Sequence, residues 1–147
     1  VADAAAGLDE ARLVRDAVAA AETGTVSAMH DATEGGLLGA FCEMAGSAGV
    51  RFEVDADAAP MRSGVGVVCD ALGVDPWKVT SSGTLVLAIA PESVDAVRAA
   101  IAARGTAVAD VGEVVEGAGV RFRGEEWTEP PRDPSWEAYA ELAGEES

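Results

Sequence analysis

The chain has 147 residues, of which 49% are hydrophobic and 5% aromatic, and it carries a formal net charge of −16. This length suits one domain, and the hydrophobic share is high enough for a packed core despite the charge. So acidic a chain lacks the clustered cations that sequence-independent nucleic-acid binding requires, and it disfavours docking on anionic membranes.

Hydrophobic periodicity predicts alternating helices and strands in the first half of the chain. Thr33 is placed to cap the second helix, and Gly49 and Gly73 are placed to end the second and third helices. The expected elements are a helix over about 8–23, a strand over 26–29, a helix opened by the glycine pair and ending near 48, a half-buried strand over 50–55 and a helix over 63–72.

The second half is predicted to continue this alternation and to end in a hairpin and a short helix. The run over 84–90 is continuously apolar, which is typical of a central strand covered on both faces. The expected elements are a helical turn opened by Asp75 and Pro76, a loop over 80–83, a strand over 84–90, a helix over 91–104, hairpin strands over 107–115 and 120–123, an irregular segment over 125–134 and a helix over 136–142. This order predicts an α+β or α/β layered domain.

The acidic residues are dispersed along the chain, which predicts a solvated surface suited to high salt. Asp and Glu number 26 against 10 Lys and Arg, and Lys78 is the single lysine. We therefore expect a halophilic, archaeal source; an ordinary acidic domain is the alternative. The longest uncharged run, 79–91, is shorter than the roughly 18 residues of a membrane span. No secretory signal is visible, so we expect a cytoplasmic protein.

Two cysteines, Cys42 and Cys69, fall in apolar helical patterns. A domain of this size needs no covalent staple, so we expect two buried free thiols, with one disulfide as the alternative. Neither cysteine has metal-ligand spacing, and His30 is the only histidine, so the sequence does not favour a zinc site.

The first candidate site is the segment His30-Asp31-Ala32-Thr33-Glu34-Gly35-Gly36, between a predicted strand and helix. Helix N-termini offer unpaired N–H groups and a positive dipole end, which suit a phosphate or carboxylate. The glycine pair would let a ligand approach the backbone, and Asp31 is a candidate magnesium ligand. The alternative is a capped turn with glycines for tight packing and a structural His30. Glu34 favours that alternative, because its carboxylate would compete with an anionic ligand.

The second candidate site is Thr80-Ser81-Ser82-Gly83-Thr84, where four hydroxyls and a glycine precede the apolar strand. Such loops can line a phosphate or polar-ligand pocket, and they are also ordinary turn chemistry. Trp77 and Trp127 are expected to pack at the rim of the domain rather than to stack on a ligand.

Several of these segments, taken in order, carry a family pattern. Asp31-x-Thr33-x-Gly35-Gly36-Leu37 and Leu72-Gly73-x-Asp75-Pro76 are its most specific elements. The remaining parts are 26–30, 43–45, 49–50, 60–61, 81–85 and 105–114. The pattern covers residues 26–114 and resembles the C-terminal domain of the AIR synthase-related family.

This resemblance implies an α+β sandwich, with a mixed sheet and helices packed on it. It implies an additional N-terminal domain that dimerises and carries magnesium-binding aspartates, with ATP bound between the domains. We expect residues 1–147 to be the C-terminal domain alone, inactive without the other half. The candidate ligand or phosphate-binding residues are His30, Asp31, Thr33, Gly35, Gly36, Ser81, Ser82, Gly83 and Thr84.

Within the family, the hydrogenase-maturation branch is most similar, and this chain departs from it at three places. Ala32 and Glu34 stand where that branch has Pro and Arg, and 81–83 reads Ser-Ser-Gly where it has Asn-Glu-Gly. The chain ends in Gly-Glu-Glu-Ser and not in the acceptor cysteine of that branch. The acceptor substrate therefore stays undefined. The competing hypothesis is a stand-alone, non-catalytic module of the same fold that binds a small anion or a protein.

Overall fold

The computed structural model describes residues 13–144, which form helices packed on two β-sheets. In chain order the elements are α2 (Leu13–Thr23), β1 (Val26–Ala32), α3 (Gly36–Ala48), β2 (Arg51–Val54), α4 (Ser63–Leu72), β3 (Thr84–Ile89), the 3-10 turn η2 (Pro91–Ser93), α5 (Val94–Ala102), β4 (Gly112–Val115), β5 (Gly119–Phe122), β6 (Glu125–Trp127) and α6 (Ser135–Gly144). This is the predicted α+β arrangement. The start of the first predicted helix, 8–12, lies outside the described residues. Within 13–144 every helix is too short or too polar for a membrane crossing.

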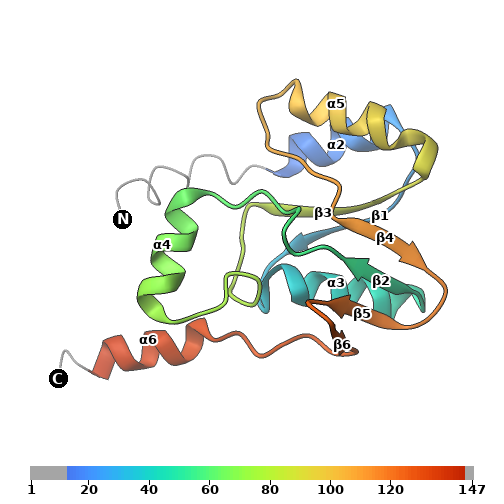
Figure 1. The fold of residues 1–147 in the computed structure, drawn as a ribbon. Coiled ribbons are helices and arrows are strands. Elements are labelled where there is room, and N and C mark those ends of the chain that lie inside the picture. Colours follow the sequence, from blue (N-terminus) through green and yellow to red (C-terminus); the bar gives the residue numbers. More distant parts are fainter. Residues whose placement is uncertain (1–12, 145–147) are drawn as a thin grey trace.

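The strands form one small antiparallel sheet and one larger mixed sheet. Strands β1 and β3 pair with each other, while the larger sheet has the order β4-β2-β5-β6. Strand β2 runs parallel to β5 and antiparallel to β4, and β5 pairs antiparallel with β6. Helix α3 lies between the two sheets and contacts strands of both (Figure 1).

The main core lies between α3 and the two sheets, and aromatic rings fill it. Phe41 of α3 packs edge-on against Phe52 of β2, with ring centroids 5.9 Å apart. Phe41 also stacks on Trp77 at 6.4 Å, and Trp77 lies 4.7 Å from Phe122 of β5. Trp77 is only 3% exposed, so the prediction that it packs at the rim is wrong. Its backbone N–H donates to Asp75 Oδ1 at 3.0 Å in a turn that carries the indole into the core.

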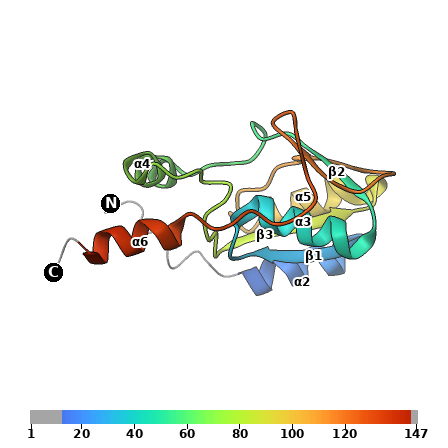
Figure 2. The ribbon, with the colours of Figure 1, turned by 90° about the horizontal axis from the view of Figure 1, so that it is seen from below.

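A second, smaller core lies on the other face of the β1–β3 sheet, under α2 and α5. Ala20 of α2 packs there with Val97 and Ile101 of α5, against Leu87 and Ile89 of β3. Because side chains alternate along a strand, the intervening residues of β3 face α3 instead. Figure 2 shows β1 and β3 lying between α2 and α3.

Strand β3 is covered on both faces, as predicted, but it is not central. Among the strands of residues 13–144 it pairs with β1 alone. Its apolar character follows from the helices, because α3 packs on one face and α2 with α5 on the other. A continuous apolar run indicates that both faces of a strand are buried, whether by helices or by another sheet. It does not indicate how many strands lie beside it.

Strands β4 and β5 do not form the predicted hairpin, because β2 lies between them. Phe52 of β2 is opposite Val114 on one side and Val120 on the other. The connection passes over the start of β2, where a Cβ built on Gly117 would lie 3.1 Å from Arg51 Cβ. The first part of the predicted strand, 107–111, lies outside β4. Two apolar runs separated by a turn in the sequence do not reveal that a strand from elsewhere in the chain lies between them in the sheet.

The segment predicted to be irregular contains β6, the hairpin partner of β5. Arg123 and Gly124 connect them with φ angles of 51° and 80°, the positive values of a type I′ turn. Trp127 of β6 is half-buried at the edge of the main core, as expected, with Lys78 Nζ 4.7 Å from its ring centroid.

Cys42 of α3 and Cys69 of α4 are both buried and free, as predicted. Burial, assisted by the neighbouring charge of Glu43, raises the pKa of the Cys42 thiol to about 11. Since the thiolate is the reactive form, this cysteine is a packing residue at neutral pH.

Candidate functional site

The two loops that the sequence proposes as a ligand site lie side by side at one end of the β1–β3 ladder. Ala32, the last residue of β1, is opposite Thr84, the first residue of β3. The Ser81 N–H donates to the Thr33 carbonyl oxygen at 3.3 Å, which links the loops directly. The structure therefore brings together the candidates in 33–36 and 81–84.

His30 and Asp31 lie within β1 and not in the predicted loop, because pairing with β3 extends the strand to Ala32. His30 Nε2 lies 2.6 Å from Glu43 Oε2, and its Nδ1 lies 3.7 Å from Asp31 Oδ1. His30 thus ties β1 to α3 instead of reaching the loops. The Asp31 side chain is 64% exposed. Residues 13–144 contain no group of three His, Cys, Asp or Glu that could hold a metal ion, so Asp31 offers only part of a coordination shell.

Helix α3 begins at Gly36 with Gly35 as its N-cap, so the prediction that Thr33 caps it is wrong. Thr33 instead supplies its carbonyl oxygen, which accepts the Gly36 N–H at 3.0 Å. Both glycines have positive φ, 76° and 64°, which residues with a Cβ rarely adopt. A Cβ built on Gly36 would lie 2.6 Å from the carbonyl oxygens of both Trp77 and Val79. The glycine pair thus serves turn geometry and close packing.

The N–H groups at the start of α3 largely have acceptors within the chain. Leu38 donates to the Trp77 carbonyl and Gly39 to the Gly35 carbonyl, each at 3.0 Å. The Gly35 N–H donates to a carboxylate oxygen of Asp133 at 3.2 Å. A ligand anion at this helix end would compete with these acceptors.

Asp133, which the sequence analysis did not single out, joins both loops to the start of α6. It is 2% exposed. Its Oδ2 accepts the Gly35 N–H and, at 2.7 Å each, the N–H and hydroxyl of Thr80. Its Oδ1 accepts the N–H and hydroxyl of Ser135 at 2.8 and 2.6 Å. Burial raises the pKa of Asp133, but the hydrogen bonds from Ser135, Thr80 and Gly35 outweigh it and hold the pKa below its usual value.

One feature of the sequence could have indicated Asp133. An Asp two residues before Ser135, at the start of a helical pattern, is typical of a helix N-terminus. That local signal identifies Ser135 as a partner of Asp133, but it gives no indication of Gly35 or Thr80.

The outward side of the two loops carries the remaining hydroxyl groups. Thr33 and Ser82 are exposed, while Ser81 and Thr84 are half-buried. Glu34, which was expected to compete with a ligand anion, accepts the indole N–H of Trp136 at 2.9 Å. The exposed hydroxyls are therefore the donors that a ligand could reach without displacing the protein's own contacts.

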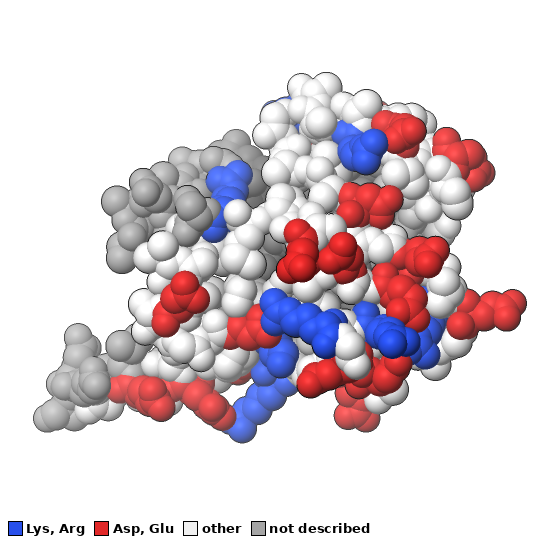
Figure 3. Space-filling model, viewed as in Figure 1, with Lys and Arg blue, Asp and Glu red and all other residues white. Residues whose placement is uncertain are grey.

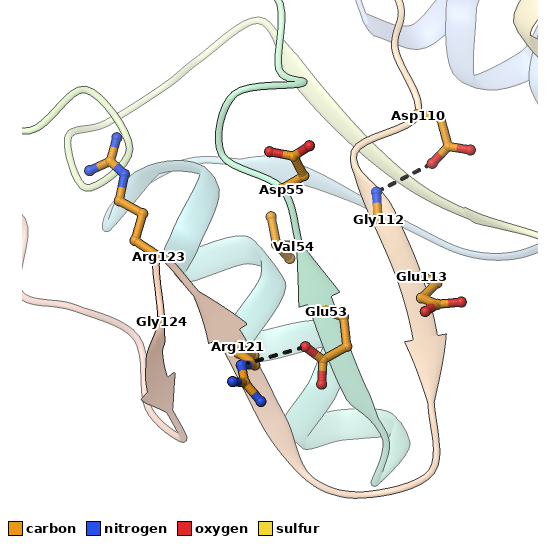
Figure 4. A pocket seen from close by; sticks show the side chains of 9 residues that line it. All are labelled: Glu53, Val54, Asp55, Asp110, Gly112, Glu113, Arg121, Arg123 and Gly124. Carbon is orange, nitrogen blue, oxygen red and sulfur yellow. Dashed lines mark hydrogen bonds and ion pairs between the residues drawn. The ribbon is translucent and has the colours of Figure 1, made fainter.

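Two hollows lie away from the point where the two loops meet, and His30 is the one candidate residue that lines either of them. A shallow hollow of about 520 Å³ lies at the β4-β2-β5 strands, with arginines on one side and carboxylates on the other (Figure 4). A hollow of about 310 Å³ lies between β1 and α3, beside the His30–Glu43 contact. The residues lining the larger one are Glu53, Val54, Asp55, Asp110, Gly112, Glu113, Arg121, Arg123 and Gly124.

Basic groups near the larger hollow are engaged by carboxylates. Figure 3 shows most Lys and Arg side chains of this view gathered in a band across its lower middle, with acidic side chains bordering the band above and below. Arg51 bonds to Glu53 at 2.8 Å and also to Glu126, and Arg123 bonds to Asp75 at 2.9 Å. These arginines neutralise neighbouring carboxylates and do not form an open cationic surface.

Comparison with known proteins identifies relatives of this arrangement. A family model for the AIR synthase related protein, C-terminal domain, matches residues 2–125. Carbamoyl dehydratase HypE of Rhizobium leguminosarum bv. viciae is 42% identical over 105 residues, which cover 70% of this chain and 30% of that protein. The chain thus spans about a third of the length of this curated relative.

Solved structures of HypE share the fold. The crystal structure of E. coli HypE, a hydrogenase maturation protein, matches with a TM-score of 0.70 and 30% identity, covering 83% of this chain and 40% of that chain. A HypE crystal structure in complex with ATP matches with a TM-score of 0.58 and 29% identity, covering 62% of this chain and 28% of that chain. The chain therefore belongs to the AIR synthase related family as its C-terminal domain, in a form similar to that of HypE.

Proposed function

We propose that this chain is the C-terminal domain of an ATP-dependent, HypE-like protein, whose segments 31–36 and 81–84 contact the nucleotide and the substrate. One observation carries the proposal: the two loops meet at one end of the β1–β3 ladder, in a family whose HypE member has been solved with ATP. Neither loop forms this ligand surface alone, because it needs both the residues that follow β1 and the residues that precede β3.

The chemistry of the loops suits contacts to phosphate oxygens. The net charge of −16 opposes anion binding, so the ligand needs local donors or a cation. The donors that this domain would offer to the phosphate are the exposed hydroxyls of Thr33 and Ser82 and the half-buried hydroxyls of Ser81 and Thr84. Mg²⁺ would offset the remaining charge, with Asp31 as one ligand and the other ligands from outside this domain. Bound ATP would supply a terminal phosphoryl group that activates an oxygen for displacement.

The reaction as a whole belongs to a larger protein. This chain corresponds to 30% of the Rhizobium HypE, whose name refers to carbamoyl dehydration. We expect the isolated chain to have negligible ATPase activity, and the full protein to be a cytoplasmic homodimer. Ala32, Glu34 and the Ser-Ser-Gly at 81–83 depart from the branch pattern, so the proposal covers ATP use and leaves the acceptor open.

Helices α4 and α6 offer a contact surface for the rest of such a protein. Both lie at one end of the molecule, away from the two cores (Figures 1 and 2). Val67 and Leu72 of α4 are 64% and 42% exposed, and Trp136 and Tyr139 of α6 are 58% and 63% exposed. Large apolar side chains gathered at one end favour a protein contact, and the N-terminal domain of the same polypeptide is its proposed partner.

The test is a titration of ATP with Mg²⁺ into the gene product that contains this chain, in molar KCl. The double variant Thr33→Val with Ser82→Ala removes two exposed hydroxyls and should weaken binding about tenfold or more, since hydrogen bonds to charged groups contribute about 1.5–3 kcal/mol. Ser47→Ala, an exposed serine at the other end of α3, is the matched control and should bind like the wild type. Equal affinity of the double variant and the wild type would refute the loop assignment and favour a non-catalytic module.

A further inference from the structure

The geometry points to Asp133 as the positioning residue of the proposed nucleotide site. We propose that its carboxylate sets the Gly35 turn and the Thr80 turn against each other, so that the hydroxyls beyond them face one ligand. This inference rests on the proposed function of the two loops. It concerns a residue beyond 125, where the family match ends.

The hydrogen bonds of Asp133 are directed mainly at the loops. A single oxygen, Oδ2, receives the Gly35 N–H at 3.2 Å and both Thr80 donors at 2.7 Å. Apart from Asp133, the loops are linked by the Ser81 N–H to Thr33 carbonyl bond at 3.3 Å and by the pairing of Ala32 with Thr84 at the strand ends. Three of the five donors to Asp133 therefore belong to the site, and the shortest contacts there are at Thr80.

A role confined to the start of α6 would not account for this arrangement. Capping that helix requires only Oδ1, which Ser135 occupies, and an exposed carboxylate would suffice. Asp133 is instead 2% exposed, and burying a carboxylate is costly unless several donors compensate it. The charge is buried where two loops from distant parts of the chain need a common acceptor.

The same carboxylate also selects where a ligand binds. Because Gly35 and Thr80 donate inward to Asp133, their N–H groups are not offered to a phosphate. The negative charge beneath them disfavours a second anion at that point. A nucleotide phosphate is thereby directed to the outward hydroxyls of Thr33 and Ser82, which Asp133 holds in place without touching the ligand.

The experiment compares Asp133→Ala and Asp133→Asn with a matched control, Asp16→Ala. Asp16 is also a buried carboxylate, bonded to Arg104 at 2.6 Å and Thr106 at 2.9 Å, but it lies in the α2–α5 part of the fold. Two readouts are taken on each variant: hydrogen exchange of the Gly35 and Thr80 amides by NMR, and ATP–Mg²⁺ affinity. Asp133→Asn removes the charge but keeps the shape of the side chain, so both measurements can be made on it if Asp133→Ala does not fold.

We expect both Asp133 variants to exchange the Gly35 and Thr80 amides at least tenfold faster, and to bind ATP about tenfold more weakly. Formate or acetate should restore both readouts in Asp133→Ala, because a small carboxylate can replace the deleted one. Asp16→Ala should lower the melting temperature without changing either readout.

Two results would overturn the inference. Unchanged exchange at Gly35 and Thr80 in the Asp133 variants would show that the carboxylate does not hold the loops. Affinity within twofold of the wild type would show that Asp133 only anchors α6. If the wild type itself binds no ATP, the proposed function fails, and the exchange measurement still decides whether Asp133 positions the loops.

Discussion

Gly36 lies so close to the backbone at Trp77 that no side chain fits between them. A Cβ on Gly36 would lie 2.6 Å from the Trp77 carbonyl oxygen, and the φ of Gly36 is +64°. Gly36→Ala should therefore lower the free energy of unfolding by about 2–4 kcal/mol, through steric overlap and backbone strain. Gly46→Ala is the control on the same helix, because a Cβ there meets nothing within 4 Å and should stabilise by up to about 1 kcal/mol. Urea unfolding measures both, and equal stability of the two variants would contradict the packing described here.

The low pKa of Asp133 predicts an acid-dependent loss of stability. Its pKa in the folded protein lies below that of an unfolded Asp, about 3.9, because hydrogen bonds favour the carboxylate over the acid. The contribution is complete above the unfolded value and disappears as pH falls through the folded value. The difference in free energy of unfolding between wild type and Asp133→Asn should thus be largest above about pH 5 and shrink below about pH 4. A difference that stays constant from pH 6 to pH 2 would contradict this assignment.

Trp77 and Trp136 should differ sharply in their contribution to stability. Trp77 is 3% exposed and packs between Phe41 and Phe122, so Trp77→Ala should cost about 3–5 kcal/mol. Trp136 is 58% exposed, and Trp136→Ala should cost about 1 kcal/mol or less through its bond to Glu34. Urea unfolding gives the two values, and the fluorescence of Trp77 should move to longer wavelength on unfolding. Similar costs for both variants would show that Trp77 is not the centre of the core.

Salt should stabilise the domain, and one cross-strand pair allows a specific test. Glu53 of β2 and Glu113 of β4 are directly opposite each other, and like charges in that position destabilise a sheet. Glu113→Lys should therefore raise the free energy of unfolding by about 0.5 kcal/mol in low salt. The gain should disappear in 2 M KCl, where screening removes the repulsion. A gain that persists at high salt would indicate a packing effect instead. A wild-type melting temperature independent of KCl would argue against the predicted adaptation to high salt.

The parts of the fold that were predictable are those fixed by neighbouring residues. Gly49 and Gly73 end α3 and α4 as expected, each with a φ of 65°, because a helix end needs a left-handed residue that glycine supplies. Strand order was not predictable in the same way. The insertion of β2 between β4 and β5 depends on how Phe52 fills the distant core, and no residue near 116–118 reports it.

In the candidate site, too, the features set by neighbouring residues could be predicted, and those set by distant residues could not. The loops at 33–36 and 80–84 could be proposed from glycines and hydroxyls, and their shared role came from the family resemblance. Asp133 could not be assigned to them, because its partners Gly35 and Thr80 are separated from it by 98 and 53 positions. Thr33 fails as an N-cap for a related reason: the close approach of 77–79 requires glycine at position 36, where the helix starts, and Gly35 takes the N-cap position.

The position of Asp133 in the chain also implies an order of folding during synthesis, in which the two cores can form before the candidate site is complete. Both sheets and both hydrophobic cores are complete with residues before 128. Gly35 and Thr80 obtain their shared acceptor only after residue 133 has left the ribosome. A nascent chain stopped before that point would hold a folded body with an unfinished site, so a segment translated after both cores completes the part proposed to bind ligand.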